Sequence, residues 1–282
     1  MPDRRAGVWR GGGREGGRRP VSIRVVTAPI IPGCEPWSAQ GGPGGALVLH
    51  GFTGSPQGMR TLAEALAAAG FTVDLPLLPG HGTAVDDLVP MRWDDWSGTA
   101  EAHFQALAAR CDSVMVVGLS MGGALTCWLA ERHPHLAGIA LVNPLVHAPG
   151  DDLRSMVQGM LDAGETTFDG IGGDIKKEGV PELGYDRTPL AALLSTFEGA
   201  DEVEAGLADI HCPVLLLTSR EDHLIDAASG AAVEARAHGP VERVWLEDSY
   251  HVATLDNDAP EIETRVVAFA RAVLAAPSGA TA

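Results

Sequence analysis

Along most of this chain, short apolar runs alternate with stretches whose apolar residues recur every three or four positions. The short runs predict buried strands, and the longer periodic stretches predict amphipathic helices. Such alternation is typical of βαβ units, in which helices join parallel strands and cover the sheet. We predict strands at residues 46–50, 71–75, 113–117, 138–142, 214–218 and 241–246. The sequence therefore predicts an α/β fold with a mostly parallel central sheet flanked by helices.

Helices are predicted in most of the intervals between these strands. They cover residues 59–69 and 93–110, a stretch that ends before Pro134, a stretch from about Asp226, and residues 260–274. Gly70 stands where a helix stop is expected, and Pro134 cannot continue a helix.

Residues 145–207 interrupt this rhythm, because they contain no strand-like run and are rich in Gly and Asp. We predict that they form a small cap inserted over one end of the sheet, and that residues 21–144 and 208–282 form the core. Within the insertion, Met156, Val157, Met160 and Leu161 have the spacing of one helix face. Two interpretations stay open for this face: a small core inside the insertion, or a wall that binds substrate, with Met156 and Met160 as the candidate residues.

The first twenty residues differ from the rest, with six Arg among many Gly and only one Asp and one Glu. Such a segment cannot bury a core, so we predict a disordered tail. No apolar run follows the arginines, so a signal peptide is not expected. The four cysteines lie in apolar surroundings without metal-ligand spacing, which predicts buried thiols and a cytoplasmic location.

The formal net charge of -17 argues against nucleic-acid binding and against docking on anionic membranes. The most membrane-like segment, residues 114–130, is short for a bilayer and contains three Gly. We therefore expect neither a nucleic-acid partner nor stable membrane insertion.

Residues 118–122 (GLSMG) match the pattern G-x-S-x-G and lie between a Val/Met run and an Ala/Leu stretch. This context predicts a strand, a sharp turn and a helix, with Ser120 exposed on the turn as a nucleophile. Glycines on both sides would prevent clashes in such a turn. A dinucleotide-binding loop is the alternative, but Ser120 replaces its central glycine and Asn143 follows the next strand where an acid is needed.

A serine nucleophile needs a base, and the base needs a carboxylate that orients it. Enzymes with this strand–serine–helix motif place the acid and then the histidine after late strands. Asp222 follows the strand at 214–218, with Glu221 and Asp226 as alternatives. His251 follows the strand at 241–246, and its alternative interpretation is a solvated loop histidine.

Two backbone N–H groups are expected to stabilise the oxyanion of acyl transfer. Met121 N–H lies at the predicted start of a helix, and Phe52 N–H lies in the loop after the strand at 46–50. His50 and His81 are predicted to be structural residues of that region. Neither has a partner at metal-ligand spacing, so we assign no metal and no cofactor.

Five motifs in this order, LVLHGFTGSP, LPGHGT, WDDW, GLSMGG and SYHVATLD, resemble those of the bacterial carboxylesterase and monoacylglycerol lipase group of α/β hydrolases. The resemblance covers about residues 46–270. It implies cofactor-free hydrolysis of short- to medium-chain acyl esters, such as monoacylglycerols. It gives the triad roles to Ser120, Asp222 and His251 and the oxyanion-hole roles to Phe52 and Met121. The small-molecule partner would be an acyl ester.

Other functions stay open on the same triad, namely thioesterase, acyltransferase and carbon–carbon hydrolase. A non-catalytic ligand sensor is a further alternative, although such a protein would be expected to lack a triad member.

Overall fold

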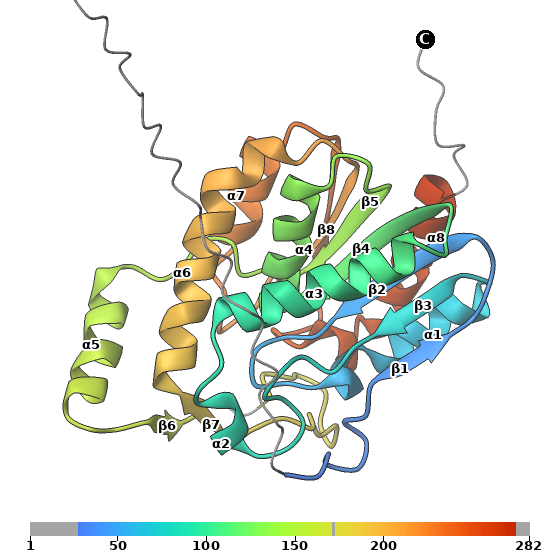
Figure 1. Ribbon diagram of the computed structural model, residues 1–282. Helices are drawn as coiled ribbons and strands as arrows, with labels where there is room; N and C mark the ends of the chain where they lie inside the picture. Colours follow the sequence, from blue (N-terminus) through green and yellow to red (C-terminus); the bar gives the residue numbers. More distant parts are fainter. Residues whose placement is uncertain (1–27, 171–172, 275–282) are drawn as a thin grey trace, which may run out of the picture.

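A seven-stranded sheet forms the centre of the molecule, with the strand order β1-β3-β2-β4-β5-β8-β9 (Figure 1). The computed structural model describes residues 28–170 and 173–274. The strands are β1 (Trp37–Ala39), β2 (Gly44–Leu49), β3 (Thr72–Leu75), β4 (Ser113–Leu119), β5 (Gly138–Val142), β8 (Val214–Ser219) and β9 (Val241–Leu246). Within this sheet, the β1–β3 pair is antiparallel and the other described pairs are parallel. The predicted fold class and all six predicted strands are confirmed, whereas the short edge strand β1 was not predicted.

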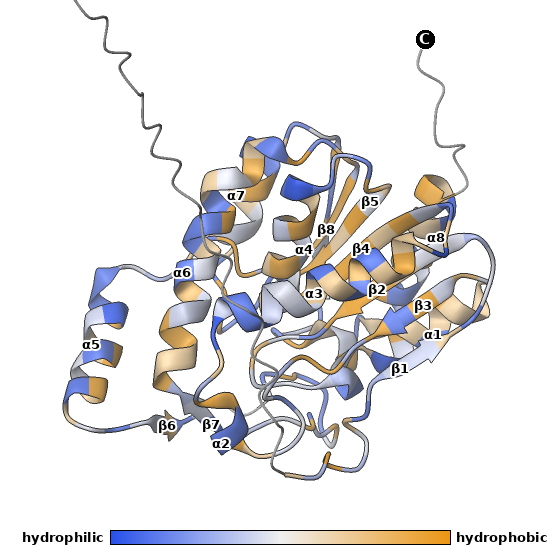
Figure 2. Ribbon diagram, viewed as in Figure 1, coloured by the Kyte–Doolittle hydropathy of each residue, from blue (hydrophilic) through white to orange (hydrophobic). Residues whose placement is uncertain are grey.

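The central strands β2, β4, β5 and β8 are buried on both faces of the sheet, to which their successive side chains point alternately. Leu47 and Val116 belong to the core on one face, and their neighbours Val48 and Val117 belong to the core on the other. These central strands include long hydrophobic stretches of the ribbon (Figure 2). This two-sided burial explains why they appear in the sequence as unbroken apolar runs.

Helices cover both faces of the sheet (Figure 1). They are α1 (Arg60–Ala68), α2 (Val85–Leu88), α3 (Trp93–Ala108), α4 (Met121–Arg132), α5 (Asp151–Asp162), α6 (Leu190–Gly206), α7 (Ala228–Arg236) and α8 (Ala259–Leu274). Short 3-10 turns lie at Pro56–Met59, Leu207–Asp209 and Ala253–Leu255. Helices α3, α4 and α7 contribute to one core, and α1 and α8 contribute to the other.

The chain between β5 and β8 contains α5, α6 and a small antiparallel sheet of β6 (Thr167–Asp169) and β7 (Arg187–Pro189). The expectation that this insertion contains no strand is therefore wrong. Each strand is only three residues long and carries no alternating pattern, so periodicity could not reveal it. Helix α6 packs on α3 and α4 of the core, whereas α5 packs on α6 at the edge of the molecule (Figure 1).

The structure also bears on the predicted tail, the membrane-like segment and the cysteines. The predicted tail, residues 1–20, lies outside the described residues. Within the described ranges, no helix combines the length and the apolar character needed to cross a bilayer. Cys34, Cys127 and Cys212 are buried free thiols as predicted, whereas Cys111 is partly exposed.

Candidate active site

Ser120 lies on the sharp turn between β4 and α4, with φ 57° and ψ −117°. A non-glycine residue with positive φ is strained, and such strain persists only when the surroundings hold it. The Ser120 N–H donates to the carbonyl oxygen of Val142 at 3.0 Å. The Ser120 carbonyl oxygen accepts the N–H groups of Ala124 at 3.0 Å and Leu145 at 3.1 Å. Contacts from two other segments therefore fix the strained turn that exposes the serine hydroxyl.

The glycines around Ser120 are required by close backbone approach. A Cβ on Gly118 would collide with the carbonyl oxygen of Gly122, and a Cβ on Gly122 would collide with the carbonyl oxygen of Leu49. Strand β2 and helix α4 can therefore approach the turn only if both positions lack a side chain. This is the physical reason for the two outer glycines of G-x-S-x-G.

We expect Gly122→Ala to destabilise the fold by roughly 1–3 kcal/mol, because the new methyl group forces α4 away from β2. Thermal unfolding followed by circular dichroism measures this loss. Gly159→Ala in α5 is the matched control, since a Cβ there meets no atom within 4 Å, and its Tm should stay equal or rise slightly. Equal unfolding temperatures for Gly122→Ala and wild type would contradict the close-approach explanation.

His251 and Asp222 form a buried pair at the ends of β9 and β8. The Nδ1 atom of His251 lies 2.8 Å from Oδ2 of Asp222, and the two side chains are 7% and 5% exposed. The other oxygen of Asp222 accepts the N–H groups of Leu224 at 2.9 Å and Ile225 at 2.8 Å. The loop thus orients the carboxylate, which leaves one oxygen for the histidine.

The two alternative acids point elsewhere. Glu221 is exposed and pairs with Lys176 at 3.2 Å. Asp226 accepts the N–H of Ala228 at 2.7 Å, just before helix α7. Of these three neighbouring acids, only Asp222 is hydrogen-bonded to His251.

Asn143 is hydrogen-bonded to the His251 loop, and the sequence prediction gave it no role in the active site. Its side-chain amide donates to the carbonyl oxygen of His251 at 2.8 Å and to Oγ of Ser219 at 2.9 Å. Its Oδ1 accepts the N–H of Ser219 at 2.8 Å. Asn143 adopts φ 43°, a left-handed conformation that Asn tolerates better than most residues. A polar residue at a strand end with a following proline was the available signal.

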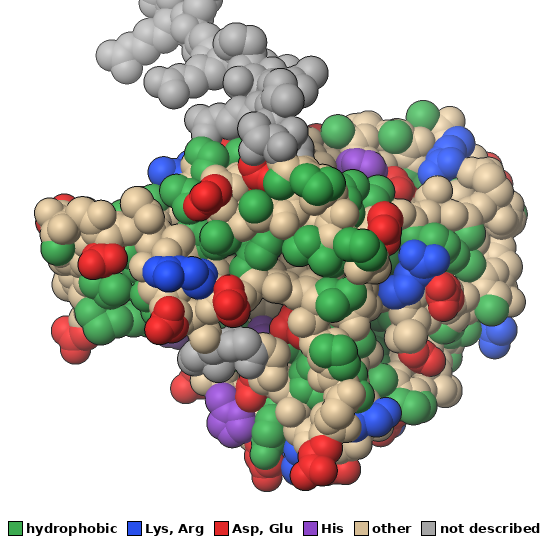
Figure 3. Space-filling view, turned by 90° about the horizontal axis from the view of Figure 1, so that it is seen from below, with side chains coloured by type: hydrophobic (Ala, Val, Ile, Leu, Met, Phe, Trp, Pro, Cys, Tyr) green, Lys and Arg blue, Asp and Glu red, His purple; other side chains and the backbone are tan. Residues whose placement is uncertain are grey.

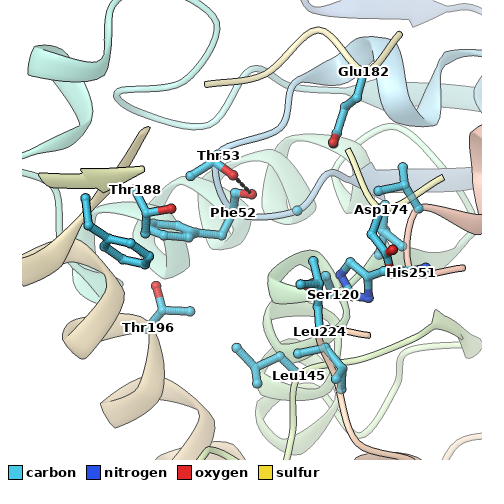
Figure 4. A pocket seen from close by; sticks show the side chains of 15 residues that line it. Phe52, Thr53, Ser120, Leu145, Asp174, Glu182, Thr188, Thr196, Leu224 and His251 are labelled. Carbon is cyan, nitrogen blue, oxygen red and sulfur yellow. Dashed lines mark hydrogen bonds between the residues drawn. The ribbon is translucent and has the colours of Figure 1, made fainter. Parts of the chain in front are cut away.

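The candidate oxyanion donors come from two elements beside Ser120, namely α4, which follows it directly, and the loop after β2, where a Cβ on Gly51 would lie 3.4 Å from Cβ of Ser120. Met121 is the first residue of α4, so its N–H has no acceptor within the helix. Phe52 comes from the loop after β2, and its ring packs edge-on against Trp96 and His81. Figure 4 shows Phe52 across the cavity from His251. Phe52 lines the cavity at Ser120 and Met121 directly follows Ser120, so both stay candidates for an oxyanion hole.

His50 fixes the start of the Phe52 loop, as predicted for a structural histidine. Its Nδ1 lies 3.0 Å from the carbonyl oxygen of Gly51, and its Nε2 accepts the N–H of Leu78 at 3.1 Å. Burial lowers the pKa of His50 to about 4. The ring is therefore neutral at pH 7, with one donor and one acceptor nitrogen, as these two bonds require.

A cavity of about 200 Å³ opens at Ser120 and His251. Its walls include apolar and hydroxyl side chains from the insertion and from the loops after β5 and β8, namely Leu145, Phe168, Thr188, Thr196, Leu224 and Ile225. Figure 3 shows a hollow on the lower face of the molecule, with histidine and acidic side chains inside it. The mixed lining suits a small amphiphilic ligand.

The structure corrects the prediction that Met156 and Met160 bind substrate. Neither residue lines the cavity, and Met156 is 55% exposed on the outer side of α5. Val157 is the buried residue of this helix, which packs on α6. The helix was predicted correctly, but of the four residues of the predicted face only Val157 is buried, and the helix packs on α6 rather than over Ser120.

Glu182 is a cavity residue that sequence reasoning missed. Burial raises the pKa of its carboxyl group, while the charge of the nearby His251 acts to lower it. Within the described ranges the carboxylate has no hydrogen-bond partner, and it projects toward the cavity (Figure 4). A partly buried acid without such a partner is unfavourable, which makes Glu182 a candidate for ligand contact.

Comparisons with known proteins agree with this geometry. The model of the Alpha/beta hydrolase family matches residues 46–263. The chain is 42% identical over 244 residues to a thermostable monoacylglycerol lipase from Bacillus sp. (strain H-257), which covers 86% of this chain and 96% of the lipase. It is 27% identical over 251 residues to a carboxylesterase from Bacillus subtilis (strain 168), which covers 88% and 98% of the two chains. A solved structure described as "LipS and LipT, two metagenome-derived lipolytic enzymes" matches with a TM-score of 0.83 and 42% identity, over 86% of this chain and 100% of that one.

Proposed function

The chain belongs to the alpha/beta hydrolase family and is a hydrolase of the serine type, and from this premise we propose that it hydrolyses short- to medium-chain carboxylic esters such as monoacylglycerols. Ser120 would be the nucleophile, His251 the general base and Asp222 the orienting acid. The observation that carries the proposal is the His251–Asp222 pair, 2.8 Å apart, whose histidine lines the same cavity as Ser120 on its strained turn. The names of the lipase and carboxylesterase relatives support an ester as substrate.

In the proposed reaction, Oγ of Ser120 attacks the ester carbonyl carbon while Nε2 of His251 takes the hydroxyl proton. The N–H groups of Phe52 and Met121 hold the oxyanion that forms. When the tetrahedral intermediate collapses, the bond to the alcohol oxygen breaks and His251 gives its proton to the leaving alcohol. Water then attacks the acyl-serine ester with His251 again as base, which releases the fatty acid and restores Ser120.

The test is a p-nitrophenyl ester series from acetate to palmitate, with monoacylglycerols and acyl-CoA measured beside it. We expect an optimum between butyrate and decanoate, because a cavity of limited depth favours chains that fill it. Preference for acyl-CoA over every ester would replace the proposal with a thioesterase. Absence of turnover on all of them would favour a ligand sensor.

Glu182 is proposed to accept hydrogen bonds from the free hydroxyls of the alcohol group. We expect Glu182→Leu to raise KM for a monoacylglycerol about 10-fold, since a hydrogen bond to a charged group contributes roughly 1.5–3 kcal/mol. The p-nitrophenyl ester of the same acid has no such hydroxyls, so its KM should change little. Glu178→Leu, at an exposed position, is the control. Equal changes for both substrates would show that Glu182 does not contact the alcohol.

Phe168 is proposed to limit the depth of the acyl pocket, with residues 145–207 acting as the cap. We expect Phe168→Ala to move the chain-length optimum toward longer acids, because each buried methylene contributes about 0.8 kcal/mol, or roughly fourfold in kcat/KM. Met160→Ala, in the same insertion but outside the cavity, should leave the optimum in place. The ester series measured on both variants checks this. A shift with Met160→Ala but not with Phe168→Ala would restore α5 as the pocket wall.

A further inference from the structure

Asp174, in the insertion, contacts the two loops that carry His251 and Asp222. Its Oδ2 accepts the N–H of His251 at 3.1 Å and the N–H of His223 at 3.2 Å. Its Oδ1 lies 2.8 Å from Nδ1 of His223. The Asp174 side chain is only 9% exposed. One buried carboxylate therefore joins the residue after Asp222 to the backbone of His251.

Asp256, which is 1% exposed, joins the same two segments, but here the carboxylate belongs to the loop after β9 and the N–H groups belong to the insertion. Its carboxylate accepts the N–H groups of Lys176 at 2.7 Å and Lys177 at 2.9 Å, both in the insertion. It also accepts the N–H of Tyr250 at 2.9 Å, directly before His251. In addition, the Val252 N–H donates to the carbonyl oxygen of Asp174 at 3.0 Å. The segment 174–177 and the loop 250–256 are thus bonded to each other in both directions.

We propose that Asp174 is a positioning residue for His251, so that this part of the insertion belongs to the catalytic apparatus. Asn143 holds the His251 carbonyl oxygen at 2.8 Å, and Asp174 holds the His251 N–H at 3.1 Å. With both backbone polar groups of His251 fixed, its ring has little freedom relative to Asp222 and Ser120. Figure 4 shows Asp174 beside His251, on the side of the cavity that contains Ser120. The proposal rests on the proposed function, because it requires His251 to act as the base.

Removal of the carboxylate leaves buried N–H groups without an acceptor, which is unfavourable and allows the loop to move. A displacement of about 1 Å at a catalytic group can lower the rate roughly 100-fold. We therefore expect Asp174→Ala to lower kcat about 100-fold with KM for p-nitrophenyl butyrate unchanged. Asp174→Asn keeps one acceptor oxygen for the His251 N–H, so it should recover most of the activity.

The readout that separates positioning from simple destabilisation is the proton NMR signal of the hydrogen bond between Nδ1 of His251 and Asp222. It should be present in wild type and Asp174→Asn and absent or shifted in Asp174→Ala. Asp258→Ala is the matched control: the Asp258 carboxylate also accepts a backbone N–H, that of Asp248 at 2.9 Å, in the loop after β9. Asp258→Ala should lower Tm, but it should change neither the NMR signal of the His251–Asp222 hydrogen bond nor kcat per folded molecule.

The proposal is overturned if Asp174→Ala keeps wild-type kcat, if it raises KM alone, or if its NMR signal equals that of wild type. An equal loss in Asp258→Ala would also overturn it, because the effect would then be one of stability. Failure of the proposed function is distinguishable, since wild type itself would then neither hydrolyse the ester nor react with a phosphonate at Ser120.

Discussion

Ser120→Ala is expected to lower kcat for p-nitrophenyl butyrate by on the order of 10⁶, the size of loss that follows removal of the nucleophile from a catalytic triad. The variant should retain its fold, because the turn is held by the backbone bonds of Ser120 to Val142, Ala124 and Leu145 rather than by its hydroxyl. Steady-state kinetics measure the loss, and circular dichroism with thermal unfolding checks the fold.

A phosphonate ester provides an independent measurement of the same assignment. Intact-mass spectrometry should show one adduct on wild type and none on Ser120→Ala. Ser55→Ala is the matched control, since Ser55 is buried and its hydroxyl has no partner within the described residues. Ser55→Ala should keep the esterase activity and still form the phosphonate adduct. An adduct that persists in Ser120→Ala, or undiminished turnover, would show that another group is the nucleophile.

Asp222→Asn is expected to lower kcat by about 10⁴ while leaving the structure intact. An asparagine NH₂ group in place of Oδ2 cannot accept a proton from Nδ1 of His251. The ring therefore takes the tautomer with its proton on Nε2, and Nε2 can then no longer accept the proton of the Ser120 hydroxyl. The remaining Oδ1 can still accept the N–H groups of Leu224 and Ile225, which Asp222 binds at 2.9 and 2.8 Å. The pH dependence of kcat, measured beside kcat itself, checks that the base rather than the fold is affected.

Glu221→Gln is the control for this prediction, because it changes an adjacent acid that does not touch the histidine. Its pair with Lys176 is solvent-exposed, and exposed ion pairs contribute at most about 1 kcal/mol. Its kcat should change less than about tenfold. If the two effects were reversed, the orienting acid would be Glu221 and the assignment of Asp222 would fail.

Much of this site was predictable because its chemistry is encoded in short segments. Burial on both faces makes the central strands apolar runs, so their ends can be located from the sequence. Parallel strands bring their carboxyl ends to the same edge of a sheet. That rule, together with the chain order serine, acid, histidine, predicted Asp222 after β8 close to His251 after β9, and the two side chains are hydrogen-bonded. The turn at Ser120 was predictable for the same local reason, since Gly118 and Gly122 are required by close approach of the backbone.

The remaining features of the site depend on contacts between distant segments, which a periodic pattern does not contain. Helical spacing predicted a helix around Met156 and Met160 correctly, but spacing cannot say which surface the helix meets, and α5 meets α6 rather than the cavity. Asp174 is 77 positions from the His251 N–H that it accepts, and no local signal separates it from a solvated acid. Glu182 and Phe168 likewise reach the cavity only because the insertion folds back over the sheet. The sequence by itself determined the fold class, the turn at Ser120 and the candidate triad, because each of these depends on local sterics or strand order. Only the tertiary structure decided the pocket walls and the hydrogen bonds that hold His251, because these depend on how the insertion packs.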